Sequence, residues 1–402
     1  MKSFHKIIET VVLSLCALLV AGCTGGDSGK DAGGGCCGSG AVDTGAPVAQ
    51  GDTVAGSAAP AGAASSAAAP SAQPDDAAAL AAIEAVGTKL KRDDQGHVVE
   101  VDFRGTKVDD AALAPLAGLK RIRSVLLAET AVTDAGMAAL GQIPSLENLD
   151  LRECKIGNAG VAQLAGLAKL RALRLSGKTG ATTVDDKAFA DVAKLTKLKV
   201  LGADFLWVSE EGLAKLDGLK GLEELYLSKT LVGDEAMALL AQFPGLKKLR
   251  VSQTQITGVG LAHLAKLGQL EDLDLSECAQ LSDDALAPLE KMTQLKRLNL
   301  WRVPLTDAGV AHLAGMTNMQ WLNIDNTLTT DAGLKYLAGM KQLVFLHLGS
   351  TAVSDAGLPQ LEGLTALKDL KVTRTAVTAA GAEQLQKKLP DTAIQLKYIE
   401  GE

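Results

Sequence analysis

Residues 343–364 read LVFLHLGSTAVSDAGLPQLEGL, and this stretch decides the fold because the chain repeats it. Its frame is LxxLxLxxTxVTDAGLxxLxxL, with Thr or Ser before the acid, and copies follow at about 24 residues. A copy this short buries its apolar side chains only against its neighbours, so the chain should be a stack that functions through its surface. A divergent copy starts at Val98, and the first apolar position of the others falls at Ile122, Leu146, Leu170, Leu198, Leu222, Leu246, Leu270, Leu295, Met319, Leu343 and Leu367.

The first six positions of the frame, numbered from its first leucine, predict a strand. Alternate side chains of a strand point to opposite faces. In the copy that starts at Leu270, we therefore expect Leu273 and Leu275 in the core and Asp272 and Ser276 in solvent. The Thr at position nine ends the strand, and its hydroxyl can bond to the backbone of the turn.

The second half of the frame predicts a short helix. A hydroxyl followed by a carboxylate, as in Thr306-Asp307, is typical of a helix N-cap and first turn. The Gly of AGL, such as Gly309, is a poor helix former, so we expect it to permit close packing between neighbouring helices. Helices are wider than the strand spacing, so the stack should curve, with its strands on the concave face.

This frame resembles that of leucine-rich repeat proteins, especially the subclass with TDxGL and a cysteine at position nine. Cys154 and Cys278 stand at that position, where most other copies have Thr. The resemblance covers about residues 98–393, or about twelve repeats, and implies an α/β fold. That fold is a leucine-rich-repeat solenoid, a right-handed horseshoe with a parallel concave sheet and short helices on the convex side. This resemblance says almost nothing about function, since receptors, adhesins, inhibitors and ubiquitin-ligase adaptors all have the same curved fold.

Both ends of the stack carry candidate caps. Residues 75–97 should form an N-terminal capping helix that covers the first strand, since DDAAALAAIEAVGTKLK has acids first, lysines last and apolar residues at helical spacing (Leu80, Ile83, Val86 and Leu90). Residues 394–402 are the expected C-terminal cap, a closing strand after a last helix that contains Leu385 and Leu389.

The N-terminal residues 1–22 read as a signal peptide whose apolar run is too short to span a bilayer, which takes roughly 20 residues. The sequence Val20-Ala21-Gly22-Cys23 resembles the lipobox of bacterial lipoproteins. That resemblance implies cleavage before Cys23, a diacylglycerol on its sulfur and a place in the cell envelope. The absence of Asp after the cysteine favours the outer membrane, facing either the periplasm or the outside. The alternative is an ordinary secretory peptide with an incidental cysteine, and Glu9 fits a lipoprotein signal poorly.

Residues 23–74 predict a disordered low-complexity tether, because Gly, Ala, Ser and Pro cannot bury enough surface to offset their ordering entropy. Cys36 and Cys37 lie in it, with their role open. Cys154 and Cys278 lie five repeats apart, roughly 24 Å at the spacing of strands, so they cannot form a disulfide.

Charge and motifs argue against an enzyme, a cofactor or nucleic acid. The net charge is −7, and Lys and Arg are spread along the sequence, whereas nucleic acid requires a clustered basic face. No catalytic triad or set of metal ligands emerges. Asp272 and Asp274 could be an acid pair, but Lys248, Arg250 and Arg297 flank them in neighbouring copies, which favours a solvated ion-pair network.

Aromatic residues supply the candidate site. Trp301, Trp321, Phe345 and His347 fall at outward positions of three consecutive copies, and Trp321 and Phe345 share a position, so they should stand roughly 5 Å apart. Clustered Trp and Arg residues are typical of interface hot spots. They could also stack on a sugar ring, or only protect the sheet. The remaining candidate ligand-binding residues are Arg297, Asn299, Asn323, Asp325 and, farther back in the stack, Tyr226.

The sequence therefore predicts a membrane-tethered, monomeric, non-enzymatic binding module. Its concave face would recognise a protein, or else an envelope glycan. A surface adhesin-like protein is the first alternative. A ubiquitin-ligase adaptor is a remote one, suggested by the TDxGL subclass alone.

Overall fold

The computed structural model describes residues 74–397. The expected signal peptide, the lipidation site Cys23, the pair Cys36 and Cys37 and nearly all of the tether lie outside the described residues. Within residues 74–397, none of the helices is long and apolar enough to cross a membrane.

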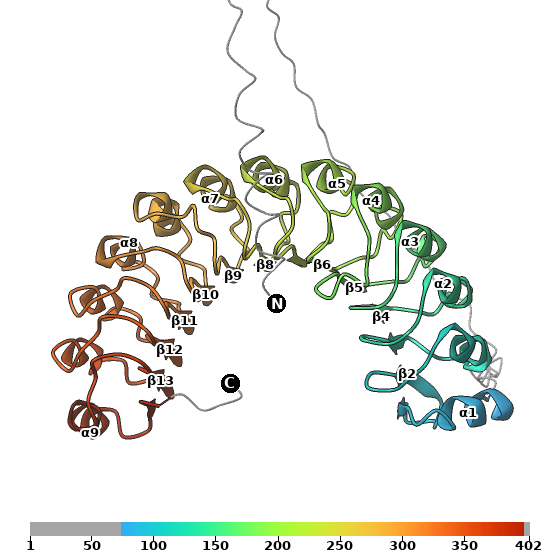
Figure 1. Ribbon diagram of the computed structural model, residues 1–402, viewed down its shortest axis with the longest axis horizontal. Helices are drawn as coiled ribbons and strands as arrows, with labels where there is room; N and C mark the ends of the chain where they lie inside the picture. The colour runs from blue at the N-terminus through green and yellow to red at the C-terminus, as the bar shows by residue number, and fades with distance from the viewer. Residues whose placement is uncertain (1–73, 398–402) are drawn as a thin grey trace, which may run out of the picture. The chain divides into compact units, whose positions relative to one another are not determined.

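A single sheet of 14 strands runs through the described chain in sequence order. Each copy of the frame supplies one strand, from β2 to β13, and all neighbours from β2 to β14 pair in parallel. Helical segments follow the strands and lie on the convex side, so the repeats form an open arc (Figure 1). The strands are β1 Lys89–Arg92, β2 Val98–Asp102, β3 Ser124–Leu126, β4 Asn148–Asp150, β5 Ala172–Ser176, β6 Val200–Asp204, β7 Glu224–Tyr226, β8 Lys248–Arg250, β9 Asp272–Asp274, β10 Arg297–Asn299, β11 Trp321–Asn323, β12 Phe345–His347, β13 Asp369–Lys371 and β14 Ala393–Gln395.

The convex segments are short because each copy has room for one or two turns after its strand. Several are 3-10 in geometry, including two with an internal proline, Pro115 and Pro288. The α-helices are α1 Ala77–Glu84, α2 Asp134–Gly141, α3 Asn158–Leu164, α4 Phe189–Val192, α5 Glu210–Ala214, α6 Asp234–Leu239, α7 Gly258–Leu264, α8 Asp307–Ala311 and α9 Ala379–Lys388. The 3-10 segments are η1 Asp110–Gly118, η2 Asp186–Ala188, η3 Leu240–Gln242, η4 Asp284–Lys291, η5 Leu334–Leu337 and η6 Leu358–Leu361.

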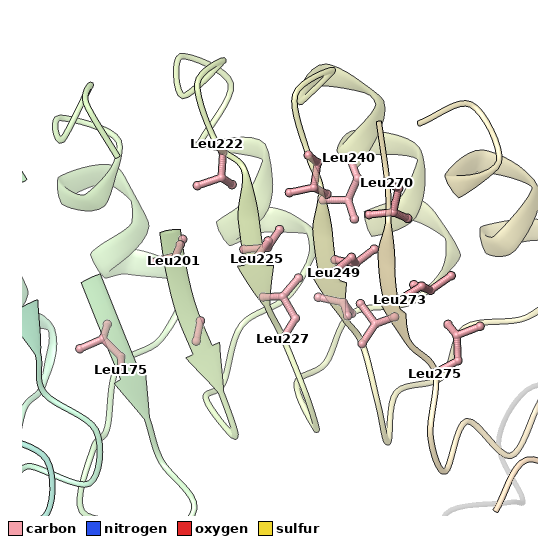
Figure 2. Close-up of a cluster of buried hydrophobic side chains, with 14 of the residues drawn as sticks. Leu175, Leu201, Leu222, Leu225, Leu227, Leu240, Leu249, Leu270, Leu273 and Leu275 are labelled. Atoms are coloured by element: carbon pink, nitrogen blue, oxygen red, sulfur yellow. The ribbon is translucent and has the colours of Figure 1, made fainter. Parts of the chain in front are cut away.

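Leucine ladders hold the copies together. Position four pairs with position four along the sheet, as in Leu298 with Leu322 and Leu322 with Leu346, and these side chains are fully buried. Figure 2 shows the same rows farther back, with Leu225, Leu249 and Leu273 stacked between the strands and the helices. Most outward positions are half-buried or exposed, but several are buried, among them Ser124, Asp150, Ser176, Ser228, Ser252, Ser276 and Thr373. Ser276, which was expected in solvent, is buried because the chain is already turning, and its hydroxyl donates to Asp274 at 2.7 Å.

The turn after each strand uses a left-handed residue that the sequence did not reveal. Position eight has a positive φ in ten copies without a glycine there, for example Arg302 at 56° and Ser350 at 51°. The residue that follows closes the turn, as predicted for position nine: the Thr351 hydroxyl donates to the Leu348 carbonyl at 2.6 Å. The same bond is made by Thr130, Thr230, Thr254, Thr327 and Thr375.

The two cysteines bond differently from threonine at the same position. The Cys154 thiol donates to the Leu127 carbonyl of the preceding copy at 3.1 Å, and the Cys278 thiol to the Val251 carbonyl at 3.2 Å. Both side chains are free and buried.

The acid of TDAG connects neighbouring copies, beyond the first-turn role that the sequence predicted. Asp307 accepts the backbone N–H of Thr330 at 2.8 Å and its hydroxyl at 2.6 Å. Thr330 in turn caps its own segment by accepting the N–H of Ala332 at 3.2 Å. The same pair of bonds joins Asp110 to Thr133, Asp186 to Ser209, Asp234 to Thr257, Asp283 to Thr306, Asp331 to Ser354 and Asp355 to Thr378.

The N-terminal cap differs from the expected single helix. Helix α1 ends at Glu84, where the Thr88 hydroxyl donates to the Ile83 carbonyl at 3.0 Å and Gly87 takes a φ of 75°. The chain then forms β1, which contains Leu90 and pairs antiparallel with β2. The edge of the first strand is therefore covered by a strand and not by the helix, because a glycine turn interrupts the helical spacing. At the other end, α9 contains Leu385 and β14 follows it at Ala393–Gln395, while residues 398–402 of the expected cap lie outside the described residues.

Candidate binding surface on the concave sheet

Three side chains from consecutive strands stack along the concave sheet. Arg297, Trp321 and Phe345 occupy the same register position of β10, β11 and β12. The Trp321 and Phe345 rings are parallel within 5°, with centroids 4.9 Å apart, and the Arg297 guanidinium lies 3.4 Å from the Trp321 centroid. Neither ring is buried in the core. We call these three residues the aromatic stack. Arg297 and Phe345 flank Trp321 on its two sides, so the stack presents the apolar edges of its rings, with a cation at one end.

A polar group lies beside the stack. His347 meets Phe345 edge-on at 6.3 Å between ring centroids, and its Nε2 lies 3.9 Å from Asp325 Oδ1. Asp325, His347 and Thr373 close tightly around Gly349, where a Cβ would stand within 2.8 Å of side-chain atoms of all three, so a larger residue would displace them. A hollow beside this group is lined by Asp325, His347, Ser350, Lys371, Thr373, Arg374 and Gln395.

The other predicted residues are only partly brought together. Asn299 and Asn323 lie in the row of His347, but their amide oxygens accept the N–H groups of Trp301 at 3.2 Å and Asp325 at 2.9 Å, which close turns. Trp301 lies at the turn after β10, with Arg302 over its ring at 5.3 Å. These three residues therefore form the border of the surface and not its centre.

Tyr226 does not belong to this surface. It lies on β7, three strands before Arg297 on β10, its hydroxyl donates to Glu224 at 2.7 Å and Arg250 lies 5.0 Å from its ring centroid. Burial and the bond to Glu224 raise the pKa of its hydroxyl. Its repeat number already placed it on this face three copies before Arg297.

Charged rows on the same sheet pair across strands as predicted. Arg297 Nε lies 3.6 Å from Asp272, Arg250 Nε lies 3.6 Å from Asp274, and Arg250 also approaches Asp204 at 3.3 Å. Burial raises the pKa of the Asp272 carboxyl, and Arg297 opposes that effect. Within residues 74–397 there is no group of three or more His, Cys, Asp or Glu side chains that could hold a metal ion.

The copies that start at Leu170 and Leu198 depart from the frame and form a separate feature after β5 and β6. The first has about four extra residues after β5, and Glu153 holds them by accepting the N–H and the hydroxyl of Thr179 at 2.7 Å each. In the next copy, Phe205 takes the left-handed φ of 60° and Trp207 is 69% exposed. Trp207 lies off the concave strands and does not approach the aromatic stack.

The comparisons with known proteins agree with this architecture. The family described as Leucine Rich repeat matches residues 142–165. An internalin (inlF) from Listeria monocytogenes superposes with a TM-score of 0.57 at 18% identity, covering 81% of this chain and 96% of that one. Internalin C2 from the same organism gives a TM-score of 0.42 at 23% identity, covering 52% of this chain and 84% of the other. None of the curated proteins compared matches this chain significantly.

The fold is thus a leucine-rich-repeat solenoid. At 18% identity, the inlF structure supports the arrangement of the backbone and not a shared ligand.

Proposed function

We propose that this chain is a lipid-anchored binding module of the cell envelope and that its concave face binds a partner protein. The observation that carries the proposal is the aromatic stack. Trp and Arg are enriched in interface hot spots, and here a Trp, a Phe and an Arg lie together on an accessible face of a chain with 3% aromatic residues.

A protein is favoured over a glycan by the variety of groups beside the stack. The stack supplies an apolar surface, the hollow next to it supplies Lys371, Arg374 and Thr373, and Arg297 supplies a cation at the opposite end. Mixed apolar, cationic and hydroxyl groups match the side chains of a protein surface. A sugar would stack on an open ring face, whereas Arg297 and Phe345 cover the two faces of Trp321.

Site-specific photo-crosslinking in the native envelope tests the ligand class. A photoreactive residue at Asn323, in the row beside the stack, should give adducts with a defined polypeptide. The same residue in place of Lys291, exposed on the convex side, should not. Adducts that contain carbohydrate and no peptide would show that the ligand is a glycan and not a protein.

Alanine substitution tests the stack itself. Trp321→Ala with Phe345→Ala should abolish the adducts at Asn323, and the matched pair Trp207→Ala with Leu231→Ala should leave them unchanged. The control pair removes more exposed apolar surface, since Trp207 is 69% and Leu231 56% exposed, but lies outside the stack. Undiminished adducts in a folded Trp321/Phe345 variant would remove the stack from the binding site.

The anchor at Cys23 is tested by labelling with radioactive palmitate. We expect Cys23→Ser to abolish the label and Cys36→Ser with Cys37→Ser to retain it. Protease treatment of intact cells then separates display on the surface, as an adhesin-like protein would require, from display in the periplasm of an outer-membrane lipoprotein. Absence of label in the unchanged chain would end the proposal of lipidation.

A further inference from the structure

Basic residues that looked scattered in the sequence are gathered by the fold on one edge of the sheet. In three of four consecutive copies, cations flank the first apolar residue: Arg121 and Arg123, Lys169 and Arg171, Lys197 and Lys199. The parallel register of β3, β4, β5 and β6 places these positions side by side where the strands begin. Every copy from Leu222 onwards has an uncharged residue at the first of these positions: Gly221, Gly245, Gln269, Gln294, Asn318, Gln342 and Ala366.

Two adjoining hollows follow this edge. Both are lined by Glu147 and Lys169. One also includes Lys120, Arg121 and Arg123, and the other includes Arg171, Lys197 and Lys199. These seven cations are called the basic edge. The premise that Lys and Arg are not grouped is therefore wrong for the folded chain, because a period of about 24 residues stacks distant residues on each other.

The acids at the edge neutralise only part of this charge. Asp93 bonds Arg121 at 2.8 Å, Glu223 pairs with Lys199 and with Lys247, and Glu147 lies 3.9 Å from Arg171. Four cations remain exposed, with no acidic partner within ion-pair distance in the described part of the chain: Lys120, Arg123, Lys169 and Lys197.

Asp75 and Asp76, among the first described residues, also lie at this edge. The Asp75 carboxylate accepts the N–H of Lys120 at 2.9 Å and the N–H of Val98 at 2.8 Å. The N–H of Asp76 donates to the Gly118 carbonyl at 3.1 Å. The residues that directly follow the expected tether are thus fixed beside the basic edge.

We infer that the basic edge docks on an anionic lipid surface. Its cations are exposed Lys and Arg side chains over shallow hollows, which suits a surface of many mobile headgroups better than one fitted ligand. A lipid at Cys23 would make the membrane the nearest such surface, because the predicted tether would span on the order of 40 Å. The aromatic stack lies on other strands, so docking leaves it accessible. The choice of a membrane as the partner of the basic edge rests on the proposed lipid anchor at Cys23. It does not depend on the aromatic stack.

Flotation with lipid vesicles tests this inference. The compact unit Ala68–Glu402 contains the complete core with both caps, and it lacks the apolar N-terminus and Cys23. It should float with vesicles of phosphatidylcholine containing about one third phosphatidylglycerol and not with phosphatidylcholine alone. Binding should disappear when the salt rises from about 0.1 M to 0.5 M, because counterions screen the surface.

A matched pair of variants assigns the binding to the edge. Replacing Lys120, Arg123, Lys169 and Lys197 by Glu should weaken binding at least tenfold, since each cation contributes separately. Replacing Lys107, Lys155, Lys291 and Lys335 by Glu changes the net charge equally at other exposed sites and should retain most of the binding. Circular dichroism establishes that both variants are folded.

Two results would overturn the inference. One is failure of the unit Ala68–Glu402 to bind anionic vesicles, or an equal loss of vesicle binding in both variants. The other is edge-dependent capture of a soluble polyanion, dextran sulfate or single-stranded DNA, under conditions where vesicles do not bind. Trp321→Ala with Phe345→Ala should not alter flotation, so failure here and failure of the proposed protein-binding surface are separate outcomes.

Discussion

Gly333 lies so close to Asp307 of the preceding copy that a Cβ on it would stand 2.5 Å from the carboxylate oxygen Oδ1. That carboxylate binds the N–H and hydroxyl of Thr330, three residues before the glycine. Thr, Asp and Gly of TDAG are therefore parts of one connection between repeats. Thr caps its segment, Asp holds the next Thr, and Gly makes room for the Asp of the copy before it.

Gly333→Ala should destabilise the protein by about 1–3 kcal/mol, because the added methyl group displaces the Asp307 carboxylate. The usual effect in a helix has the opposite sign, since Ala is favoured over Gly by roughly 0.5–1 kcal/mol. Urea denaturation measures the change. Gly315→Ala is the control, with no atom within 4 Å of the new Cβ, and should not destabilise. If Asp307→Ala does not reduce the cost of Gly333→Ala, the collision is not the cause.

Asp307→Asn should cost about 1–3 kcal/mol of unfolding free energy, because the amide cannot accept both bonds from Thr330 and loses the charge-assisted one. The same substitution at the exposed Asp217 removes an equal charge and should change stability by less than about 0.5 kcal/mol. Equal effects at the two sites would mean that net charge, and not the connection, matters.

Asp355 gives this connection a pH dependence. The hydroxyl and the N–H of Thr378 bond to its carboxylate and lower its pKa below the ordinary 3.8. A carboxyl with a lowered folded pKa stabilises fully above its unfolded value, and the contribution is lost as pH falls through the folded pKa. The difference in denaturation midpoint between the unchanged chain and Asp355→Asn should therefore be largest near neutral pH and should shrink below about pH 4. A difference that stays constant down to pH 3 would contradict this mechanism.

Cys154 and Cys278 should not react with a maleimide in the native protein. Both are fully buried, and burial raises the pKa of the Cys278 thiol to about 11, so little thiolate forms near neutrality. Mass spectrometry after labelling, with and without urea, measures this. Cys154→Thr with Cys278→Thr should cost less than about 1.5 kcal/mol, because Thr closes the same turn in other copies. Rapid native labelling would show that these turns open.

Alanine substitutions at Trp321 and at its neighbour Leu322 should distinguish a residue needed for binding from a residue needed for folding. Leu322 is fully buried, so Leu322→Ala should cost about 2–5 kcal/mol. Trp321→Ala should cost under about 1.5 kcal/mol, since it removes one stacked pair and one cation–π contact on an accessible face. Thermal denaturation of both variants tests this. A cost for Trp321→Ala as large as that for Leu322→Ala would make the stack a structural element.

Some features of the site could be predicted because they depend on repeat position alone. Trp321 and Phe345 share a position, so their adjacency followed from the period. The near-parallel rings, the Arg297 guanidinium over Trp321 and the close contacts around Gly349 depend on side-chain rotamers, which the period does not give. Tyr226 lies on the same face three strands before Arg297, as its repeat number implies.

By itself, the sequence determined the repeat, its buried leucines, the order and parallel pairing of the strands and the turn-closing threonines. All of these follow from local periodicity and from the need of each copy to bury one face. The tertiary structure alone decided which copy receives each Asp of TDAG, where the left-handed turns fall and how a strand covers β2. These are relationships between residues 23 or more positions apart or backbone angles without a glycine signal, and they are fixed only when the copies pack in register.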